Sequence, residues 1–156
     1  MTNGYLRVAA VSPLHKICDV PRNVARIISL TEELDKKGVE LAVFPELSIT
    51  GYACGDLLHN FKLLDDARQG LDRIADATRD FDIDIVVGLP VAEGNAVYNC
   101  AALIQKGDVN VVKKTYLPGY NEFYEKRWFQ PASADDQPQI FESHGARIGI
   151  EICEDL

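Results

Sequence analysis

The sequence predicts an α/β fold in which helices cover a mixed sheet, because short apolar runs alternate with segments of helical period. Three apolar runs bounded by turn-forming residues are typical of buried strands: YLRVAAV (5–11), VELAVFPE (39–46) and IDIVVGLP (83–90). The second and third runs each have a proline at or near their end. Proline has no N–H to donate to a strand ladder, so we expect both strands to end there. A chain of 156 residues with 47% hydrophobic side chains suits a single core.

Two segments between these runs have apolar residues at helical spacing. PRNVARIISLTEELDKKG (21–38) begins with a proline suited to a first turn and closes on lysines and a glycine, which are typical helix-ending signals. A second amphipathic stretch extends from about Lys62 to Phe81. We expect each helix to place one face on the sheet.

The second half of the chain predicts a hairpin, a long loop and a final strand. AVYNCAALIQ (96–105) and VNVVKKTY (109–116) flank Lys106-Gly107-Asp108, where glycine allows the positive φ of a tight turn. The stretch from 116 to 139 has aromatic residues, prolines and charges without a period, so we expect an irregular loop with about one helical turn. RIGIEIC (147–153) predicts a last strand.

Composition narrows the functional classes. The net charge of −8, from 16 basic and 24 acidic residues, disfavours nucleic acid and anionic membranes as partners. No apolar run approaches the roughly 20 residues of a membrane span, and no signal peptide is recognisable, so we expect a cytoplasmic protein. The cysteines are scattered without a CxxC pair and are expected as free thiols: Cys18, Cys54, Cys100 and Cys153.

Three chemically capable side chains lie at or just past the ends of apolar strands: Glu46, Lys114 and Cys153. Strand ends in α/β folds converge on one crevice. A thiol, a carboxylate and an ammonium group brought together there supply a nucleophile, a proton carrier and an electrostatic stabiliser. Taken singly, each has a structural explanation, as a buried thiol or a solvated charge.

Metal and cofactor signals are weak. His15 and Cys18 form an isolated HxxC, and the other histidines have no ligand partner at a recognised spacing, so no metal site is expected. The chain contains no P-loop and no GxGxxG, and we expect no cofactor in this segment.

FPELSITGY (44–52), KTYLPGYNEFYEKRWF (114–129) and EICEDL (151–156) together resemble the three motifs of the nitrilase, or carbon–nitrogen hydrolase, superfamily. The second and third motifs are most similar to the N-terminal glutaminase domain of glutamine-dependent NAD synthetases. The resemblance covers essentially the whole chain. It implies a nitrilase-like αββα sandwich and hydrolysis of the L-glutamine side-chain amide through a cysteine thioester.

The resemblance also implies roles for individual residues. Glu46 would act as general base and acid, Lys114 as the second catalytic residue and Cys153 as the nucleophile. Glu122 lies where many superfamily members place a second glutamate, and Glu125 is the rival for that position. The substrate pocket would include Tyr52, Tyr120 and Glu154, with the last facing the α-ammonium group of glutamine.

The chain is shorter than a complete domain of this family. We therefore interpret residues 1–156 as the N-terminal part of a nitrilase-like glutaminase domain, truncated after the nucleophile. A synthetase domain, with its ATP and magnesium, would be a further partner in full-length proteins. An uncovered sheet face predicts a homo-oligomer. A free-standing amidase or carbamoylase, and an inactive fragment or noncatalytic assembly module, remain alternative interpretations.

Overall fold

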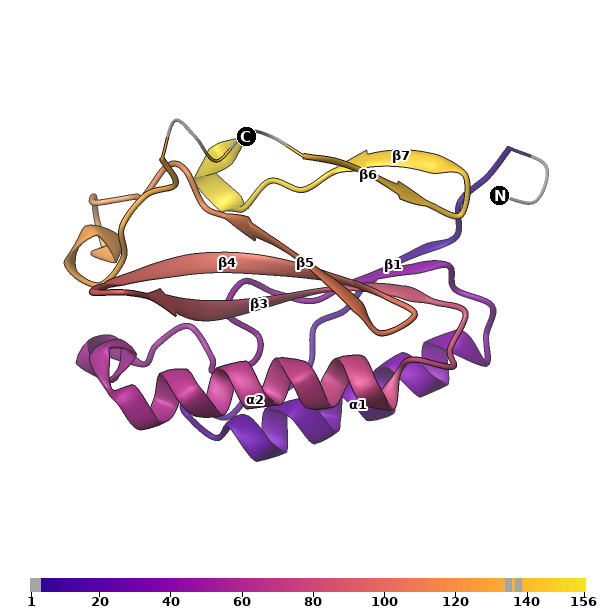
Figure 1. Cartoon of the computed structure of the whole chain (residues 1–156), viewed down its shortest axis with the longest axis horizontal. Helices are drawn as coiled ribbons and strands as arrows, with labels where there is room; N and C mark the ends of the chain where they lie inside the picture. The colour runs from indigo at the N-terminus through magenta and orange to yellow at the C-terminus, as the bar shows by residue number, and fades with distance from the viewer. Residues whose placement is uncertain (1–3, 134–135, 137–138) are drawn as a thin grey trace.

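The computed structural model describes residues 4–133, 136 and 139–156, and its centre is a five-stranded sheet (Figure 1). The strands lie side by side in chain order: β1 (Val8–Ala10), β2 (Leu41–Val43), β3 (Asp84–Glu93), β4 (Ala96–Gln105) and β5 (Asp108–Lys113). β1, β2 and β3 are parallel, whereas β4 and β5 each run antiparallel to the strand before them. The predicted α/β class with a mixed sheet is confirmed.

Two helices cover one face of this sheet, α1 (Val20–Asp35) and α2 (Phe61–Ala77) (Figure 1). α1 has Asp19 as its N-cap, and the Asn60 side chain caps α2 by accepting hydrogen bonds from two backbone N–H groups. The helices pack closely at Gly70, where an added Cβ would lie 2.9 Å from Val24 Cγ2. Their buried faces form the main core against the sheet. Both predicted helices are confirmed, although α2 ends before Phe81.

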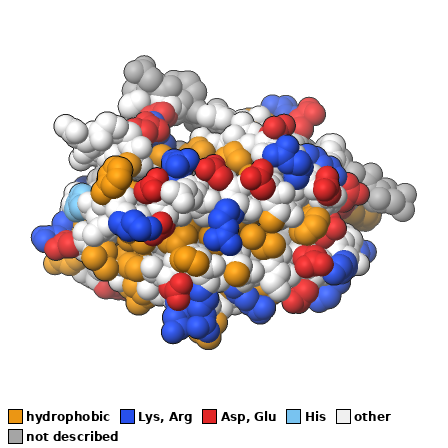
Figure 2. Space-filling model, turned by 60° about the horizontal axis from the view of Figure 1, so that its bottom comes forward, with side chains coloured by type: hydrophobic (Ala, Val, Ile, Leu, Met, Phe, Trp, Pro, Cys, Tyr) orange, Lys and Arg blue, Asp and Glu red, His pale blue; other side chains and the backbone are white. Residues whose placement is uncertain are grey.

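The outer surface of the helices carries interspersed charges of both signs (Figure 2). Arg68 pairs with Asp72 one helical turn away at 3.0 Å, and Arg79 pairs with Asp76 at 2.9 Å. Exposed pairs of this kind contribute little to stability, but they keep the surface solvated. This side of the molecule therefore presents charges of both signs among apolar side chains, with no large area of one charge (Figure 2).

The opposite face of the sheet is partly covered by a hairpin of β6 (Ile140–Ser143) and β7 (Ala146–Gly149) (Figure 1). A second apolar cluster lies between them, formed by Leu41, Val86, Ala101, Leu103 and Ile152 with Leu6, Phe141, Ile148 and Ile150. The fold is thus a helix layer, a sheet and the beginning of a second sheet, which matches the predicted part of an αββα sandwich.

The structure corrects the last predicted strand. β7 ends at Gly149, and Cys153 begins a 3-10 helix (Cys153–Asp155) instead of closing a strand. β6 was not predicted, because four residues are too few to show a clear alternation. Its turn is nevertheless a favourable one, since His144 and Gly145 both have positive φ, as do Lys106 and Gly107 in the predicted hairpin between β4 and β5.

The prediction that Pro90 ends a strand is also wrong, because β3 continues to Glu93. Pro90 faces Asn99 of β4, whose backbone carbonyl accepts the Lys114 N–H on the opposite side. The nitrogen of Pro90 therefore points away from β4. On that side β2 pairs with β3 only as far as Val86, so the missing N–H breaks no ladder bond.

Candidate active site

Glu46 is positioned by a tight loop that follows β2 and packs against β3. Leu47 has a φ of 53°, and the loop is fixed to Gly88, which donates to Ser48 Oγ at 3.0 Å and accepts from the Ile49 N–H at 3.0 Å. A Cβ on Gly88 would lie 2.2 Å from Leu47 N. Only glycine allows the backbone after Glu46 to approach the sheet this closely.

Lys114 follows β5 directly and is completely buried. Its Nζ lies 2.7 Å from Glu46 Oε1 and 2.9 Å from Glu125 Oε1. Burial alone would lower the pKa of this lysine, but the hydrogen bonds and charges of the two carboxylates outweigh it and raise the pKa above its ordinary value. Lys114 is therefore an ammonium ion held between two carboxylates.

Glu125, and not Glu122, is the second glutamate beside the lysine. Glu125 lies in a 3-10 helix (Glu125–Arg127) in the long loop and is 1% exposed, whereas Glu122 is exposed. Tyr52 donates its hydroxyl to Glu125 Oε1 at 2.5 Å, and burial together with this carboxylate raises the pKa of Tyr52. The two glutamates that the sequence left as rivals are thus separated by their surroundings.

The loop that carries Glu125 is anchored to a 3-10 helix at Gly55–His59. Arg127 donates two hydrogen bonds to Asp56, at 2.8 and 3.0 Å, and Trp128 Nε1 donates a third at 2.9 Å. These donors hold the pKa of Asp56 well below its usual range. The loop therefore has a fixed attachment, as expected of a loop that positions functional groups.

Cys153 lies at the start of the last 3-10 helix, with its side chain exposed and a φ of 53°. Asp155 attaches this segment to the chain just after Lys114, because its Oδ1 accepts the N–H groups of Thr115 and Tyr116 at 2.9 and 2.8 Å. A positive φ is uncommon for a residue other than glycine and is frequent at functional sites. The nucleophile candidate is thus held by a constrained turn.

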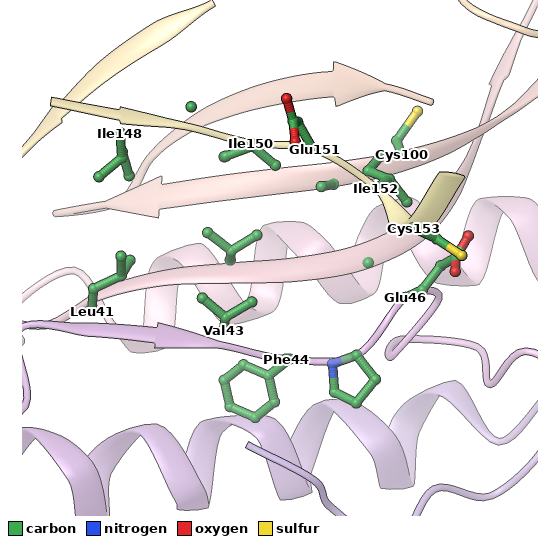
Figure 3. Close-up of a pocket in the computed structure, with 15 residues that line it drawn as sticks. Leu41, Val43, Phe44, Glu46, Cys100, Ile148, Ile150, Glu151, Ile152 and Cys153 are labelled. Carbon is green, nitrogen blue, oxygen red and sulfur yellow. The ribbon is translucent and has the colours of Figure 1, made fainter. Parts of the chain in front are cut away.

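Glu46 and Cys153 line one pocket of about 300 Å³ between the sheet and the C-terminal segment. Figure 3 shows the two side chains directed to the same end of this pocket. Its walls are mostly apolar: Leu41, Val43, Phe44, Val86, Ala101, Ile148, Ile150 and Ile152. The Glu46 carboxylate and the Cys153 thiol therefore lie together at one end of a mostly apolar pocket.

The predicted pocket residues fall into two places. Tyr52 lies beside Glu125, in the cluster around Lys114. The Tyr120 hydroxyl donates to the Glu154 carboxylate, and the Tyr120 ring meets Phe123 edge-on at a centroid distance of 5.9 Å. Tyr120 and Glu154 also line a small pocket that includes Lys126.

The other cysteines lie in different surroundings from Cys153. Cys54 and Cys100 are buried, and burial raises the pKa of each to about 12. Cys18 is half-buried. Among the thiols, Cys153 alone is exposed, which favours access to a substrate or an alkylating reagent.

Sequence reasoning missed two residues that contact the site. Asn99 donates to Glu46 Oε1 at 2.6 Å, and Asp155 fixes the Cys153 segment as described above. Asn99 had a signal, since it is a polar residue inside an otherwise apolar strand. Asp155 lies in the EICEDL motif, but its role could not be read from the sequence because its contacts reach residues about 40 positions earlier in the chain.

The part of the chain that the structure describes has neither a candidate metal cluster nor a candidate membrane span. No group of three or more histidine, cysteine or carboxylate side chains there is placed to hold a metal ion. None of the helices in the described ranges is both long and apolar enough to cross a bilayer.

The chain is similar to known carbon–nitrogen hydrolases over almost its whole length. The sequence profile of the carbon–nitrogen hydrolase family matches residues 7–156. The glutamine-dependent NAD(+) synthetase of Mycobacterium tuberculosis (strain ATCC 25618 / H37Rv) is 34% identical over 99% of this chain. That of Aquifex aeolicus is 35% identical over 88% of it. The chain spans about a quarter of the length of these relatives.

Solved structures show the same relationship. A glutamine-dependent NAD(+) synthetase from Cytophaga hutchinsonii superposes with a TM-score of 0.79 at 28% identity, over 92% of this chain and 24% of its own. A mutant of an amidase from Nesterenkonia sp. AN1 superposes with a TM-score of 0.80 at 25% identity, over 96% of this chain and 58% of its own. With residues 7–156 matched, this chain belongs to the carbon–nitrogen hydrolase family.

Proposed function

We propose that this chain carries the site of an amidase that hydrolyses the side-chain amide of L-glutamine through a thioester on Cys153. The observation that supports this most directly is the placement of Glu46, whose carboxylate pairs with buried Lys114 and lines the same pocket as the exposed Cys153 thiol. Similarity to glutamine-dependent NAD(+) synthetases supports the choice of glutamine.

In the proposed first half-reaction, Glu46 accepts the thiol proton while the Cys153 sulfur attacks the amide carbon. The carbonyl oxygen becomes an oxyanion. Lys114 gives two of its N–H groups to carboxylates, which leaves a third for this oxygen, and the backbone N–H of Glu154 is a second candidate donor. A preorganised donor of this kind typically contributes about 3–4 kcal/mol to the transition state.

The tetrahedral intermediate then collapses. Glu46 returns its proton to the nitrogen, so the C–N bond breaks with release of ammonia and leaves a thioester. In the second half-reaction Glu46 removes a proton from water, hydroxide attacks the thioester, and the thiol is regenerated with the carboxylic acid as product. Glu125 and Tyr52 hold Lys114 in place through both steps. Glutamate and ammonia are the balanced products of glutamine and water.

Ammonia release from L-glutamine by the purified 156-residue chain tests this proposal. We expect hydrolysis to disappear in Cys153→Ala and Glu46→Gln, and to persist in Cys18→Ala, the matched control at a half-buried thiol. Mass spectrometry of the acid-quenched reaction should detect a glutamyl group on the peptide that contains Cys153. Hydrolysis that survives Cys153→Ala would refute the thioester route.

In a longer protein we propose that the ammonia passes to a synthetase domain for ATP-dependent formation of NAD from its deamidated precursor. Support comes from the names of the relatives, of which this chain spans about a quarter. Stimulation of glutamine hydrolysis by an added NAD synthetase domain is the expected result. Equal rates with and without that domain would argue against the coupling.

A second candidate is an amidase for small aliphatic amides, which is favoured by the apolar walls of the pocket and by the similarity to the Nesterenkonia amidase. The structure of that amidase mutant shows acrylamide added at its active-site cysteine. Comparing propionamide with L-glutamine separates the two functions. Turnover of propionamide with none of glutamine would replace the first proposal with this one.

A further inference from the structure

Asn99 lies in β4 with no solvent exposure, and it contacts the side chain of Glu46 and the backbone of Lys114. Its side-chain Nδ2 donates to Glu46 Oε1 at 2.6 Å, and its backbone carbonyl accepts the Lys114 N–H at 2.8 Å. The same Glu46 oxygen accepts from Lys114 Nζ at 2.7 Å. One residue of the sheet therefore touches the carboxylate and fixes the backbone of the lysine beside it.

The two oxygens of Glu46 are placed differently by these contacts. Oε1 receives two N–H donors, whereas within the described ranges no hydrogen bond reaches Oε2. We propose, on the basis of the function proposed above, that Asn99 is a positioning residue whose carboxamide occupies Oε1, so that Oε2 of Glu46 carries the proton during amide hydrolysis. The two donors on Oε1 restrict rotation of the carboxylate and leave Oε2 available on a residue that lines the same pocket as Cys153.

The other end of the Asn99 carboxamide supports a functional reason for this residue. Asn99 Oδ1 is buried and has no hydrogen-bond partner among the described residues. Reversing the amide would place this oxygen against Glu46 Oε1, so the contact with the carboxylate fixes its orientation. An unpaired buried carbonyl destabilises a fold. The presence of this unpaired carbonyl in an apolar strand indicates that the role of Asn99 is to provide the N–H donor, and not to stabilise the fold.

The geometry explains why the contact would matter for rate. A general base must lie within hydrogen-bond reach of the proton that it accepts, and small misplacements reduce the rate steeply. Lys114 alone constrains Oε1 from one direction, on the β5 side. The Asn99 N–H comes from β4, so Oε1 is held from two directions instead of one.

The variant Asn99→Leu separates positioning from structure, because leucine has a similar size but neither the donor nor the unpaired oxygen. We expect kcat for glutamine hydrolysis to fall by about 10- to 100-fold, with KM within about twofold and a melting temperature equal to or above that of the wild type. Asn110→Leu, at an exposed position of β5, is the matched control and should change none of the three. Unchanged kcat in Asn99→Leu, or a loss of kcat that only parallels a lower melting temperature, would overturn the inference.

A final measurement needs no turnover and so distinguishes this inference from the proposed function. The side-chain N–H₂ resonances of Asn99, assigned by their absence in Asn99→Leu, should have different chemical shifts in the wild type and in Glu46→Gln, because one of these N–H groups donates to Glu46 Oε1, while those of Asn110 should coincide in the two proteins. Asn99 resonances that coincide in the two proteins would overturn the inference whether or not the chain is active. A wild type whose Asn99 resonances depend on Glu46 but which releases no ammonia would refute the proposed function and leave the contact established.

Discussion

Lys114 and Glu125 form an ion pair of 2.9 Å in which both side chains are almost completely inaccessible to solvent. An unpaired charge at such a position would be strongly unfavourable, so the contact with Glu125 favours the charged form of Lys114. Because Glu46 shares the same ammonium group, the pair also determines where the Glu46 carboxylate lies. The buried Lys114–Glu125 pair therefore fixes the position of Glu46 at the more exposed end of the site.

Glu125→Gln should reduce amide hydrolysis by about 100-fold or more and lower stability by about 3–5 kcal/mol, because it removes one of the two carboxylates from a buried lysine. Glu122→Gln, three residues earlier and exposed, should leave both quantities unchanged. Steady-state ammonia release and urea unfolding of both variants provide the comparison. Equal losses in the two variants would show that the loop, and not the Glu125 contact, is responsible.

Gly88→Ala should unfold or strongly destabilise the chain, by about 3 kcal/mol or more, since the added Cβ would lie 2.2 Å from the backbone nitrogen of Leu47. Gly149→Ala is the matched control. There the nearest contact of a Cβ is Ile140 Cδ1 at 3.7 Å, an ordinary distance. Thermal unfolding of the two variants measures the difference, and a Gly88→Ala chain as stable as the control would mean that the Glu46 loop can move away from β3 without cost.

The parts of this structure that follow from local patterns could be predicted from the sequence. Helical spacing located α1 and α2, and the glycine after Lys106 located the turn between β4 and β5. Those signals depend on residues within one or two turns of each other, which is why they can be recognised without the fold.

Features that depend on distant contacts could not be predicted in this way. The choice of Glu125 over Glu122 depends on Tyr52 and Lys114, which only the fold brings to the loop. Similarly, Pro90 is compatible with a strand interior because β2 stops pairing before it. A proline or a glutamate has the same local sequence signal in either situation, so tertiary pairing decides the outcome.

Stability should fall at alkaline pH in a way that depends on Cys100. Burial raises the pKa of this thiol from its ordinary 9.0 to about 12, so the unfolded chain releases its proton first as the pH rises. The free energy of unfolding that depends on the neutral Cys100 thiol is unaffected below about pH 9. It decreases between about pH 9 and 12, by up to about 1.4 kcal/mol per pH unit. Urea unfolding should therefore show a shallower alkaline loss in Cys100→Ala than in the wild type. Parallel losses in the two proteins would contradict the assignment.

Asp155 should control the placement of Cys153 through the backbone of residues 115 and 116. Its Oδ1 accepts both N–H groups, and Oδ2 accepts the Ile152 N–H at 3.3 Å, so Asp155→Ala releases the turn that carries the thiol from the segment that follows Lys114. We expect Asp155→Ala to reduce kcat by about 100-fold.

The variant Asp155→Asn keeps an oxygen that can accept the Thr115 and Tyr116 N–H groups, and we expect it to recover most of the loss in kcat. Asp80→Ala, at an exposed position after α2, should match the wild type. Alkylation of Cys153 by iodoacetamide, followed by peptide mass spectrometry, gives a second readout. Because the turn orients the sulfur toward the end of the pocket occupied by Glu46, its release in Asp155→Ala should change the alkylation rate of this thiol and leave that of Cys18 unaffected. If Asp155→Asn is as impaired as Asp155→Ala, the charge of Asp155, and not its hydrogen bonds to the backbone, positions the nucleophile.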